Sequence, residues 1–245
     1  MNPIIEAQLA HRSIRKYLDK NIEPTLLHQL INSAQGAASS SFIQAYSLVQ
    51  VTNTENRKKI ATLAGGQNWV EAAPEFLVIC ADLSRVEYAC VEQGLGKLEG
   101  YAEHFLTATV DAALMAQNLM LAAESVGLGA VFIGGIRNDP AQVSELLSLP
   151  EQVYPVFGIC LGYPDAEPDV KPRLPVDVVL HTDRYDASRC EADVKAYDAQ
   201  MEDYYQSRGD NQKTSNWSEQ TAAAVQKKKR EHMLAFLQER GFLKH

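Results

Sequence analysis

Residues 100–127, GYAEHFLTATVDAALMAQNLMLAAESVG, form the stretch that decides the fold. Its apolar residues recur at three-to-four spacing, the pattern of one helix face, and Gly127 stands where a glycine commonly ends a helix. The stripe comprises Ala102, Phe105, Leu106, Thr109, Ala112, Ala113, Ala116, Leu119, Met120 and Ala123. A helix of about 27 residues spans about 40 Å, so the sequence predicts a long central helix.

The small side chains of this stripe allow another backbone to approach closely, so the core of the same chain or a partner helix can cover it. The stripe has more apolar surface than one subunit of this length needs for its own core. We therefore expect a dimer, and we expect a carboxylate at Ala116 to break it.

Predicted strands and helices surround the long helix. Runs rich in β-branched residues predict strands at 46–52, 76–80, 129–134 and 154–161, and helices are expected to begin at Pro24 and after Asp139. Four prolines predict an extended segment over 163–175. A short strand at 178–181 and helices at 187–207 and 216–240 are expected to follow. We expect a single domain over 1–245, with 187–245 as a helical C-terminal extension.

Composition narrows the class of protein. The 245 residues are 46% hydrophobic and 22% charged, as in folded globular proteins. The net charge is −8, and residues 212–245 contribute +4 to it, so the remaining residues carry −12. An acidic body argues against nucleic acid as a partner, because such binding needs basic surface that neutralises phosphates.

No apolar run approaches the roughly 20 residues that cross a bilayer, and Glu6 interrupts any signal-like start. The four cysteines contain no Cys-x-x-Cys pair, which argues against a disulfide scaffold or a zinc ribbon. A cytoplasmic protein with no membrane partner is expected.

The common catalytic and nucleotide-binding signatures are absent from the sequence. It contains no Gly-x-Gly-x-x-Gly, no Walker loop and no histidine spacing typical of a metal site. The serines at 39–41 lack the Gly-x-Ser-x-Gly elbow of a nucleophile. We expect no metal site and no nucleophilic serine.

Two groups of cationic residues remain, at 11–16 and at Lys171-Pro-Arg173. The proline after Lys171 favours extended backbone, so the head groups of Lys171 and Arg173 can point to the same side. Two such cations suit a phosphate. The pattern predicts an anionic ligand.

Seven short motifs stand in order along the chain: His11-Arg-Ser-Ile-Arg15, Ala38-Ser-Ser-Ser41, Gly66-Gln67, Met115-Ala-Gln-Asn118, Ala123-Glu-Ser-Val-Gly-Leu-Gly129, Phe132-Ile-Gly-Gly-Ile-Arg-Asn138 and Lys171-Pro-Arg-Leu-Pro175. Together they resemble the flavin-dependent nitroreductase family, in its oxygen-insensitive NADPH nitroreductase and NADPH-flavin reductase branch. Departures from the family pattern are an apparent insertion at 84–104 and the basic run at 226–230. The apparent insertion affects the expected wall of the substrate site. The basic run affects the expected preference between NADPH and NADH.

The resemblance implies an α+β protein with the three-layer α/β/α nitroreductase fold. It implies a mainly antiparallel mixed sheet, a long central dimer helix and a C-terminal helical extension. It further implies a homodimer that binds FMN non-covalently, takes electrons from NADPH and reduces nitroaromatics, quinones or related acceptors by a ping-pong, two-electron reaction.

The resemblance also implies roles for individual residues. The expected FMN-binding residues are His11, Arg12, Ser13, Ile14, Arg15, Ser39, Ser40, Ser41, Gln67, Phe132, Ile133, Gly134, Gly135, Lys171 and Arg173. The expected NADPH or substrate residues are Arg15, Ser41, Phe42, Arg208 and Arg230. The serines are expected to come from the other subunit, and Arg15 to lie near the pyrimidine edge, where a cation stabilises the negative charge of reduced flavin. The resemblance also implies that the chemistry takes place on the flavin, so no catalytic acid, base or nucleophile is expected from the protein.

Two other functions remain open at this point. One is an NADPH-FMN reductase that supplies free reduced flavin, which would use the same residues. The other, more distant, is a non-enzymatic anion- or nucleic-acid-binding protein that uses residues 226–230.

Overall fold

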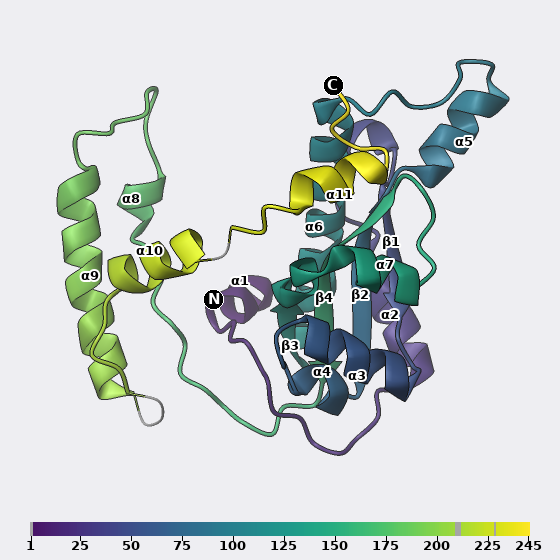
Figure 1. Ribbon diagram of the computed structural model, residues 1–245. Helices are drawn as coiled ribbons and strands as arrows, with labels where there is room; N and C mark the ends of the chain where they lie inside the picture. Colours follow the sequence, from purple (N-terminus) through teal and green to yellow (C-terminus); the bar gives the residue numbers. More distant parts are fainter. Residues whose placement is uncertain (1, 209–211, 228) are drawn as a thin grey trace. The chain divides into compact units, whose positions relative to one another are not determined.

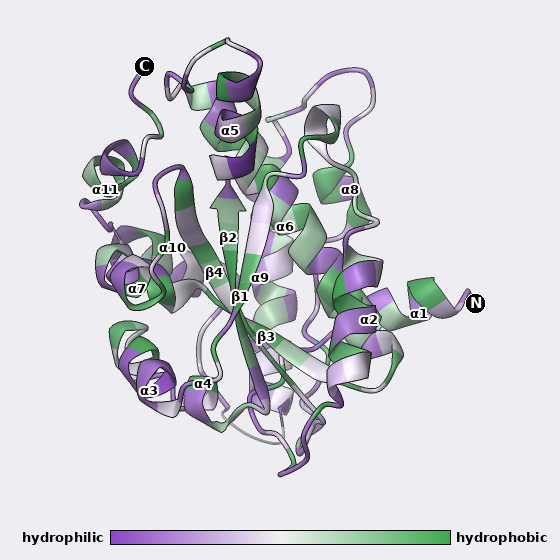
Figure 2. Ribbon diagram, turned by 90° about the vertical axis from the view of Figure 1, so that its right-hand side faces the viewer, coloured by the Kyte–Doolittle hydropathy of each residue, from purple (hydrophilic) through white to green (hydrophobic). Residues whose placement is uncertain are grey.

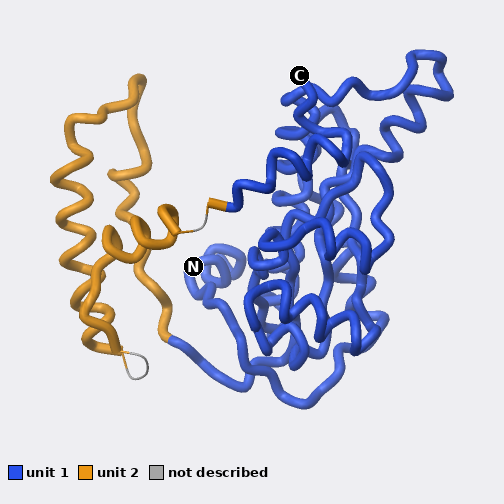
Figure 3. Tube along the Cα trace, viewed as in Figure 1, with its two compact units in different colours: residues 1–168, 230–245 blue, residues 169–229 orange. Residues whose placement is uncertain are grey.

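The computed structural model describes residues 2–208, 212–227 and 229–245 (Figure 1). The chain divides into two compact units, residues 1–168 with 230–245, and residues 169–229 (Figure 3). We refer to them as unit 1 and unit 2. The expected single domain over 1–245 stays a prediction.

Unit 1 contains a four-stranded sheet in the order β1-β2-β4-β3, in which every strand pair is antiparallel. The strands are β1 (Tyr46–Gln50), β2 (Glu75–Asp82), β3 (Gly129–Ile133) and β4 (Val153–Gly162). Each coincides with a predicted strand to within a few residues. A single parallel bridge joins Ser13 to Ala130 of β3.

The helices of unit 1 are α1 (Pro3–Leu9), α2 (Pro24–Ala34), α3 (Thr54–Leu63), α4 (Trp69–Ala72), α5 (Ser84–Glu92), α6 (Ala102–Ser125), α7 (Pro140–Leu146) and α11 (Met233–Glu239). Two short 3₁₀ helices, η1 (Ser40–Phe42) and η2 (Gly134–Asn138), complete it. The expected cap of α7 is present, because the side chain of Asp139 accepts a hydrogen bond from the Gln142 amide.

Helices cover both faces of the sheet, which gives three layers (Figure 2). Alternate residues of β2 divide between the two cores: Leu77 and Ile79 pack with α2 and α6, whereas Phe76 and Val78 pack with α3 and α7. This is the α+β fold that the resemblance implies.

Helix α6 packs its alanine-rich stripe against the sheet of its own chain. Its buried residues are Ala108, Asp111, Ala112, Met115, Ala116, Leu119, Met120 and Ala123. Ala116 is fully buried in this core, so the expectation that it belongs to a dimer interface is wrong. Within the described part of the chain, α6 is the one helix long and apolar enough to span a membrane by length and composition.

Unit 2 contains α8 (Val176–Val179), α9 (Cys190–Ser207) and α10 (Trp217–Lys227). The strand expected at 178–181 is wrong, because Pro175 accepts a hydrogen bond from the Val178 amide and a helical turn begins there. The single helix expected over 216–240 is also wrong. Arg230 has a left-handed φ of 45°, which separates α10 from α11.

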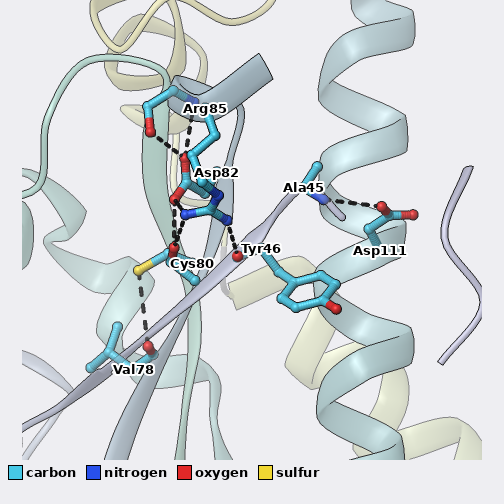
Figure 4. Close-up of polar contacts among 9 residues, drawn as sticks. Ala45, Tyr46, Val78, Cys80, Asp82, Arg85 and Asp111 are labelled. Carbon is cyan, nitrogen blue, oxygen red and sulfur yellow. Dashed lines mark hydrogen bonds and ion pairs between the residues drawn. The ribbon is translucent and has the colours of Figure 1, made fainter. Parts of the chain in front are cut away.

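Residues 84–104, where an insertion is expected from the family pattern, contain α5 and the segment after it. A buried carboxylate, Asp82 at the end of β2, anchors this helix (Figure 4). Asp82 accepts hydrogen bonds from Ser47 Oγ (2.5 Å), Ser84 Oγ (2.6 Å) and Arg85 Nη1 (2.9 Å). The start of α5 is thereby tied to β1 and β2.

We expect Ala116→Asp to lower the free energy of unfolding by at least about 3 kcal/mol, because the carboxylate would be buried without a partner. Chemical denaturation followed by circular dichroism measures this difference. Ala116→Gly is the control, with an expected loss of about 1 kcal/mol from helix propensity. An Ala116→Asp protein as stable as the parent would contradict the placement of Ala116 in this core.

Candidate functional site

The segment that carries His11 to Arg15 lies along the free edge of β3. The Ile14 amide donates to Ala130 O (3.0 Å), and the Tyr17 hydroxyl donates to Ile14 O (2.7 Å). Burial raises the pKa of that hydroxyl, so it remains a donor. Ile14 is buried and packs where Gly129 has no side chain, since a Cβ there would lie 2.5 Å from Ile14 Cγ1.

Two of the three basic residues in this segment, His11 and Arg12, have acidic neighbours. His11 Nδ1 lies 2.6 Å from Glu124 Oε1, at the end of α6, and Arg12 Nη1 lies 3.0 Å from Glu167 Oε1. Among the residues that the structure describes, Arg15 makes no ion pair, and its guanidinium stands 5.7 Å from the centre of the Trp69 ring. Arg15 is thus the cation of this segment with the most freedom to meet an anionic ligand.

A cavity of about 650 Å³ opens beside the same segment. It lies among α1, the end of α6 and residues 164–167, and Arg12 and Glu124 both line it. The Arg12–Glu167 ion pair and the carboxylate of Glu124 are therefore at a concave surface.

The turn after α3 brings Gln67 against the turn η2. Gln67 Nε2 donates to Ala64 O (2.8 Å), and these same two groups fill the space that a side chain at Gly135 would need. Gly135 is therefore a glycine because of this close approach. Gln67 and Gly135, both expected in the site, lie side by side.

Two arginines hold η2 in place. Arg230 donates to Gly134 O (3.0 Å) and to Asn138 Oδ1 (3.0 Å). Arg137 donates to the carbonyl of Val156, the residue of β4 left without a partner where the register with β2 shifts. Burial lowers the pKa of both guanidiniums, and for Arg137 the nearby charge of Arg230 lowers it further.

The two residues before η2 differ in what they can offer a ligand. Ile133 is fully buried, so its side chain belongs to the core. Phe132 is half-buried and meets Phe157 edge to face, with ring centres 4.8 Å apart.

The loop of Ser39 to Phe42 is fixed by a residue that the sequence analysis did not single out, Asp111 of α6. Ser39 Oγ donates to Asp111 Oδ2 (2.7 Å), and the Ser40 amide donates to Asp111 Oδ1 (3.0 Å). Ser41 and Phe42 have left-handed φ angles of 46° and 57°, and the Phe42 side chain is exposed.

Unit 2 holds the remaining expected residues. Tyr197 of α9 donates to Pro172 O (2.8 Å), which fixes the segment of Lys171 and Arg173. Lys171 Nζ lies 5.3 Å from the centre of the Tyr205 ring, and the guanidinium of Arg208 lies 5.9 Å from it. Lys171 and Arg208 thus share one aromatic neighbour.

In unit 1, the Arg15 guanidinium lies near the Trp69 ring, Gln67 lies against Gly135, and Arg230 donates to Gly134 O in the same turn η2. The loop of Ser39 to Phe42 is attached to Asp111. The sequence holds one signal for Asp111, since it is the only charged residue between Phe105 and Ala123. Nothing in the sequence marked Trp69.

Solved structures show which kind of protein has this fold. The structure of NADPH:FMN oxidoreductase from Vibrio harveyi, complexed with NAD⁺, superposes with a TM-score of 0.89 at 42% identity, covering 100% of both chains. The present chain therefore has the nitroreductase fold.

The sequence comparisons identify the family. The profile of the "Nitroreductase family" matches residues 9–163, and that of the "Nitroreductase family, C-terminal domain" matches residues 171–245. The chain is 45% identical to "NADPH-flavin oxidoreductase" of Vibrio harveyi, with 100% of both chains covered. It is 41% identical to "Oxygen-insensitive NADPH nitroreductase" of Salmonella typhimurium, with 99% of both covered. The chain belongs to the nitroreductase family, as predicted.

We expect Gly129→Ala to release residues 11–15 from β3, because the added methyl group would overlap Ile14. Hydrogen exchange at the Ile14 amide measures this release, and we expect protection to fall about tenfold or more. Ile14→Ala in the same chain makes room for the methyl group and serves as the compensating variant. Unchanged protection in Gly129→Ala would contradict the described packing.

Proposed function

We propose that this protein is an NADPH-dependent FMN oxidoreductase that reduces nitroaromatics, quinones or related acceptors by two electrons in a ping-pong reaction. The names of the relatives from Vibrio harveyi and Salmonella typhimurium support this activity. We further propose that it acts in the cytoplasm.

The observation that carries the proposal is the arrangement around Arg15. A guanidinium without an acidic partner among the described residues stands beside Trp69, two positions after Gln67. Gln67 lies against Gly135, where the backbone comes close. A cation and an amide beside a glycine turn are suited to the polar edge of a flavin. The residues present therefore fit FMN, which supplies the hydride chemistry when bound.

For the FMN phosphate we propose His11, Ser13, Lys171 and Arg173. Because the Nδ1 atom of His11 faces Glu124, its Nε2 atom is free to face a ligand. A lysine, an arginine and a hydroxyl supply the charge-assisted hydrogen bonds that a dianionic phosphate needs. We propose that Arg12 and Ile14 contribute through the backbone of the same segment, and Phe132 to Gly135 through the flavin-lining turn.

For the dinucleotide we propose Arg208 as the residue that meets the extra phosphate of NADPH. Its guanidinium lies beside Tyr204 and Tyr205, which hold it at the surface of α9. Arg230 is bonded to Gly134 O and Asn138, so we propose that it acts near the flavin-lining turn. Ser41 and Phe42 complete the proposed substrate side. We propose that Ser39, Ser40 and Ser41 bind the FMN of the other subunit.

We also propose a homodimer formed through the exposed face of α6. Leu106, Val110 and Leu114 lie one helical turn apart on that face, with 54%, 52% and 44% of their surface exposed. The apolar residues of α1, including Ile4 and Leu9, are also exposed. An apolar surface of this kind is typical of obligate interfaces.

The alternative function is an NADPH-FMN reductase that releases reduced flavin. The name of the Vibrio harveyi relative, "NADPH-flavin oxidoreductase", supports this alternative. Measured release of reduced FMN against turnover of a nitroaromatic or a quinone separates the two activities.

The purified protein should be yellow, with one FMN per subunit. Lys171→Ala with Arg173→Ala should weaken FMN binding at least a hundredfold, because each charge-assisted contact contributes about 1.5 to 3 kcal/mol. Flavin fluorescence during dialysis or titration measures the loss. The matched control is Lys58→Ala with Lys59→Ala on the exposed side of α3. Equal FMN retention in the two double variants would show that the phosphate assignment is wrong.

Val110→Asp should give a folded monomer that has lost FMN, because the carboxylate would be placed in an apolar interface. Light scattering gives the mass, and circular dichroism reports the fold. The comparison is Leu95→Asp, at an exposed apolar residue outside α6. A Val110→Asp dimer as stable as the parent would refute this interface.

A further inference from the structure

A cavity in unit 1 is lined by residues that have no part in the proposed FMN, NADPH or acceptor site. Its volume is about 640 Å³, and residues of α2, β1, α5 and α6 line it together with residues 43–44. Small-molecule sites in proteins have volumes of about 300 to 1,000 Å³. The cavity therefore has the size of a separate binding site for a small molecule.

The walls of this cavity are mainly apolar. Ile31 of α2, Leu48 of β1 and Val86 of α5 line it, and all three pack against the core between α6 and the sheet. Met115 of α6 also lines it and is fully buried. Such walls favour an organic molecule with an apolar body over a hydrated inorganic ion, because contact between apolar surfaces removes both from water.

Tyr46, which also lines the cavity, has a buried hydroxyl without a hydrogen-bond partner among the described residues. The residue has 6% of its surface exposed, and Figure 4 shows its ring on the α6 side of β1. The hydroxyls of Tyr17, Tyr154 and Tyr197 all have partners. A buried hydroxyl without a partner opposes folding, and native proteins contain few of them. A polar group of a ligand would supply the missing partner.

Arg85 is the one charged residue that lines the cavity. Its Nη1 atom donates to Asp82 Oδ2 and to Ser47 Oγ, both at 2.9 Å, and its Nη2 atom donates to the carbonyl of Tyr46 at 2.6 Å (Figure 4). These bonds hold the guanidinium in place, whereas its Nε atom has no partner among the described residues. A held arginine with an unused donor suits a carboxylate, because little ordering of the side chain is needed on binding.

The two polar groups stand at opposite ends of one residue. Arg85 bonds to the backbone carbonyl of Tyr46, whereas the hydroxyl without a partner is at the tip of the Tyr46 side chain. A ligand that reaches both groups must therefore be about as long as a tyrosine residue. A benzene ring with a carboxylate at one end and a hydroxyl at the opposite end has this length.

We propose that this cavity binds a small carboxylic acid whose apolar body ends in a hydroxyl, with 4-hydroxybenzoate as the representative of the class. Its carboxylate accepts from Arg85 Nε, its ring lies among Ile31, Val86 and Met115, and its hydroxyl pairs with that of Tyr46. The proposal goes beyond the proposed function and does not depend on it, because no residue that lines the cavity is assigned to FMN, NADPH or the acceptor.

The test is a calorimetric titration of the full chain, as purified, with 4-hydroxybenzoate. We expect saturable binding of one molecule per subunit, without a change in the absorbance of bound flavin. Benzoate, which lacks the hydroxyl, should bind about fivefold more weakly. The neutral 4-hydroxybenzamide should bind at least about tenfold more weakly, because it cannot make a charge-assisted bond to Arg85.

Variants assign these differences to the two residues. Tyr46→Phe removes only the hydroxyl and should bind 4-hydroxybenzoate and benzoate equally, whereas Tyr88→Phe, at an exposed tyrosine of α5, should keep the difference. Arg85→Gln should lose the preference for the acid over the amide, whereas Lys97→Gln, at an exposed residue after α5, should keep it. If Arg85→Gln does not fold, the comparison of the acid with the amide in the parent protein decides whether the charge is recognised.

Three results would overturn the proposal. The first is the absence of saturable binding, which is also the result expected if a second copy of the chain fills the cavity. The second is an equal preference for 4-hydroxybenzoate over benzoate in the parent and in Tyr46→Phe. The third is a shift of the flavin bands in proportion to the heat, which would place the ligand at the flavin. Failure of the proposed function is distinguishable, because a protein without flavin or NADPH oxidation can still bind 4-hydroxybenzoate in this cavity.

Discussion

Helix α6 packs against the sheet through small side chains, and two segments with candidate site residues, 11–15 and 39–42, are attached to this helix. Ala112 and Ala116 allow the helix to lie close to β2 and β4, and the one carboxylate on the buried face, Asp111, holds the loop of residues 39–45. The end of the same helix supplies Glu124 to His11. The opposite face leaves Leu106 and Val110 exposed. One helix thus supports the core, two site segments and the proposed dimer surface.

The rest of the site depends on turns whose residues are required by packing. Gly135 leaves room for Ala64 and Gln67, and Gly129 leaves room for Ile14. Arg230 bonds to the carbonyl of Gly134, and Arg137 bonds to that of Val156. These two arginines donate hydrogen bonds to backbone carbonyls at the turns, and they also place positive charge next to the turns. In this way the fold sets the electrostatic surroundings of a ligand before any ligand binds.

Sequence periodicity predicted the parts of the fold that local pattern determines. The stripe of α6, the proline start of α2 and the cap of α7 are local signals, and the structure has these elements. The strand expected at 178–181 failed because an apolar run of valines cannot be assigned to strand or helix by composition alone. Ala116 was misplaced because a stripe of alanines does not reveal what covers it.

The residues proposed for the site come from the family resemblance and stay a prediction, since they lie in separate turns with no common period. The partners that hold them could not be predicted in this way. Asp111 binds a loop about seventy residues earlier in the chain, and Trp69, at the start of α4, lies near Arg15. Such long-range contacts follow from the tertiary structure, and residue type alone does not encode them.

An anaerobic titration of the purified protein with NADPH, followed by visible absorbance, tests the central claim most directly. The account predicts that the bands of oxidised flavin disappear at one NADPH per subunit. It also predicts that they return when a quinone is added after the donor has been consumed. A colourless protein, or flavin bands that persist in excess NADPH, would contradict it.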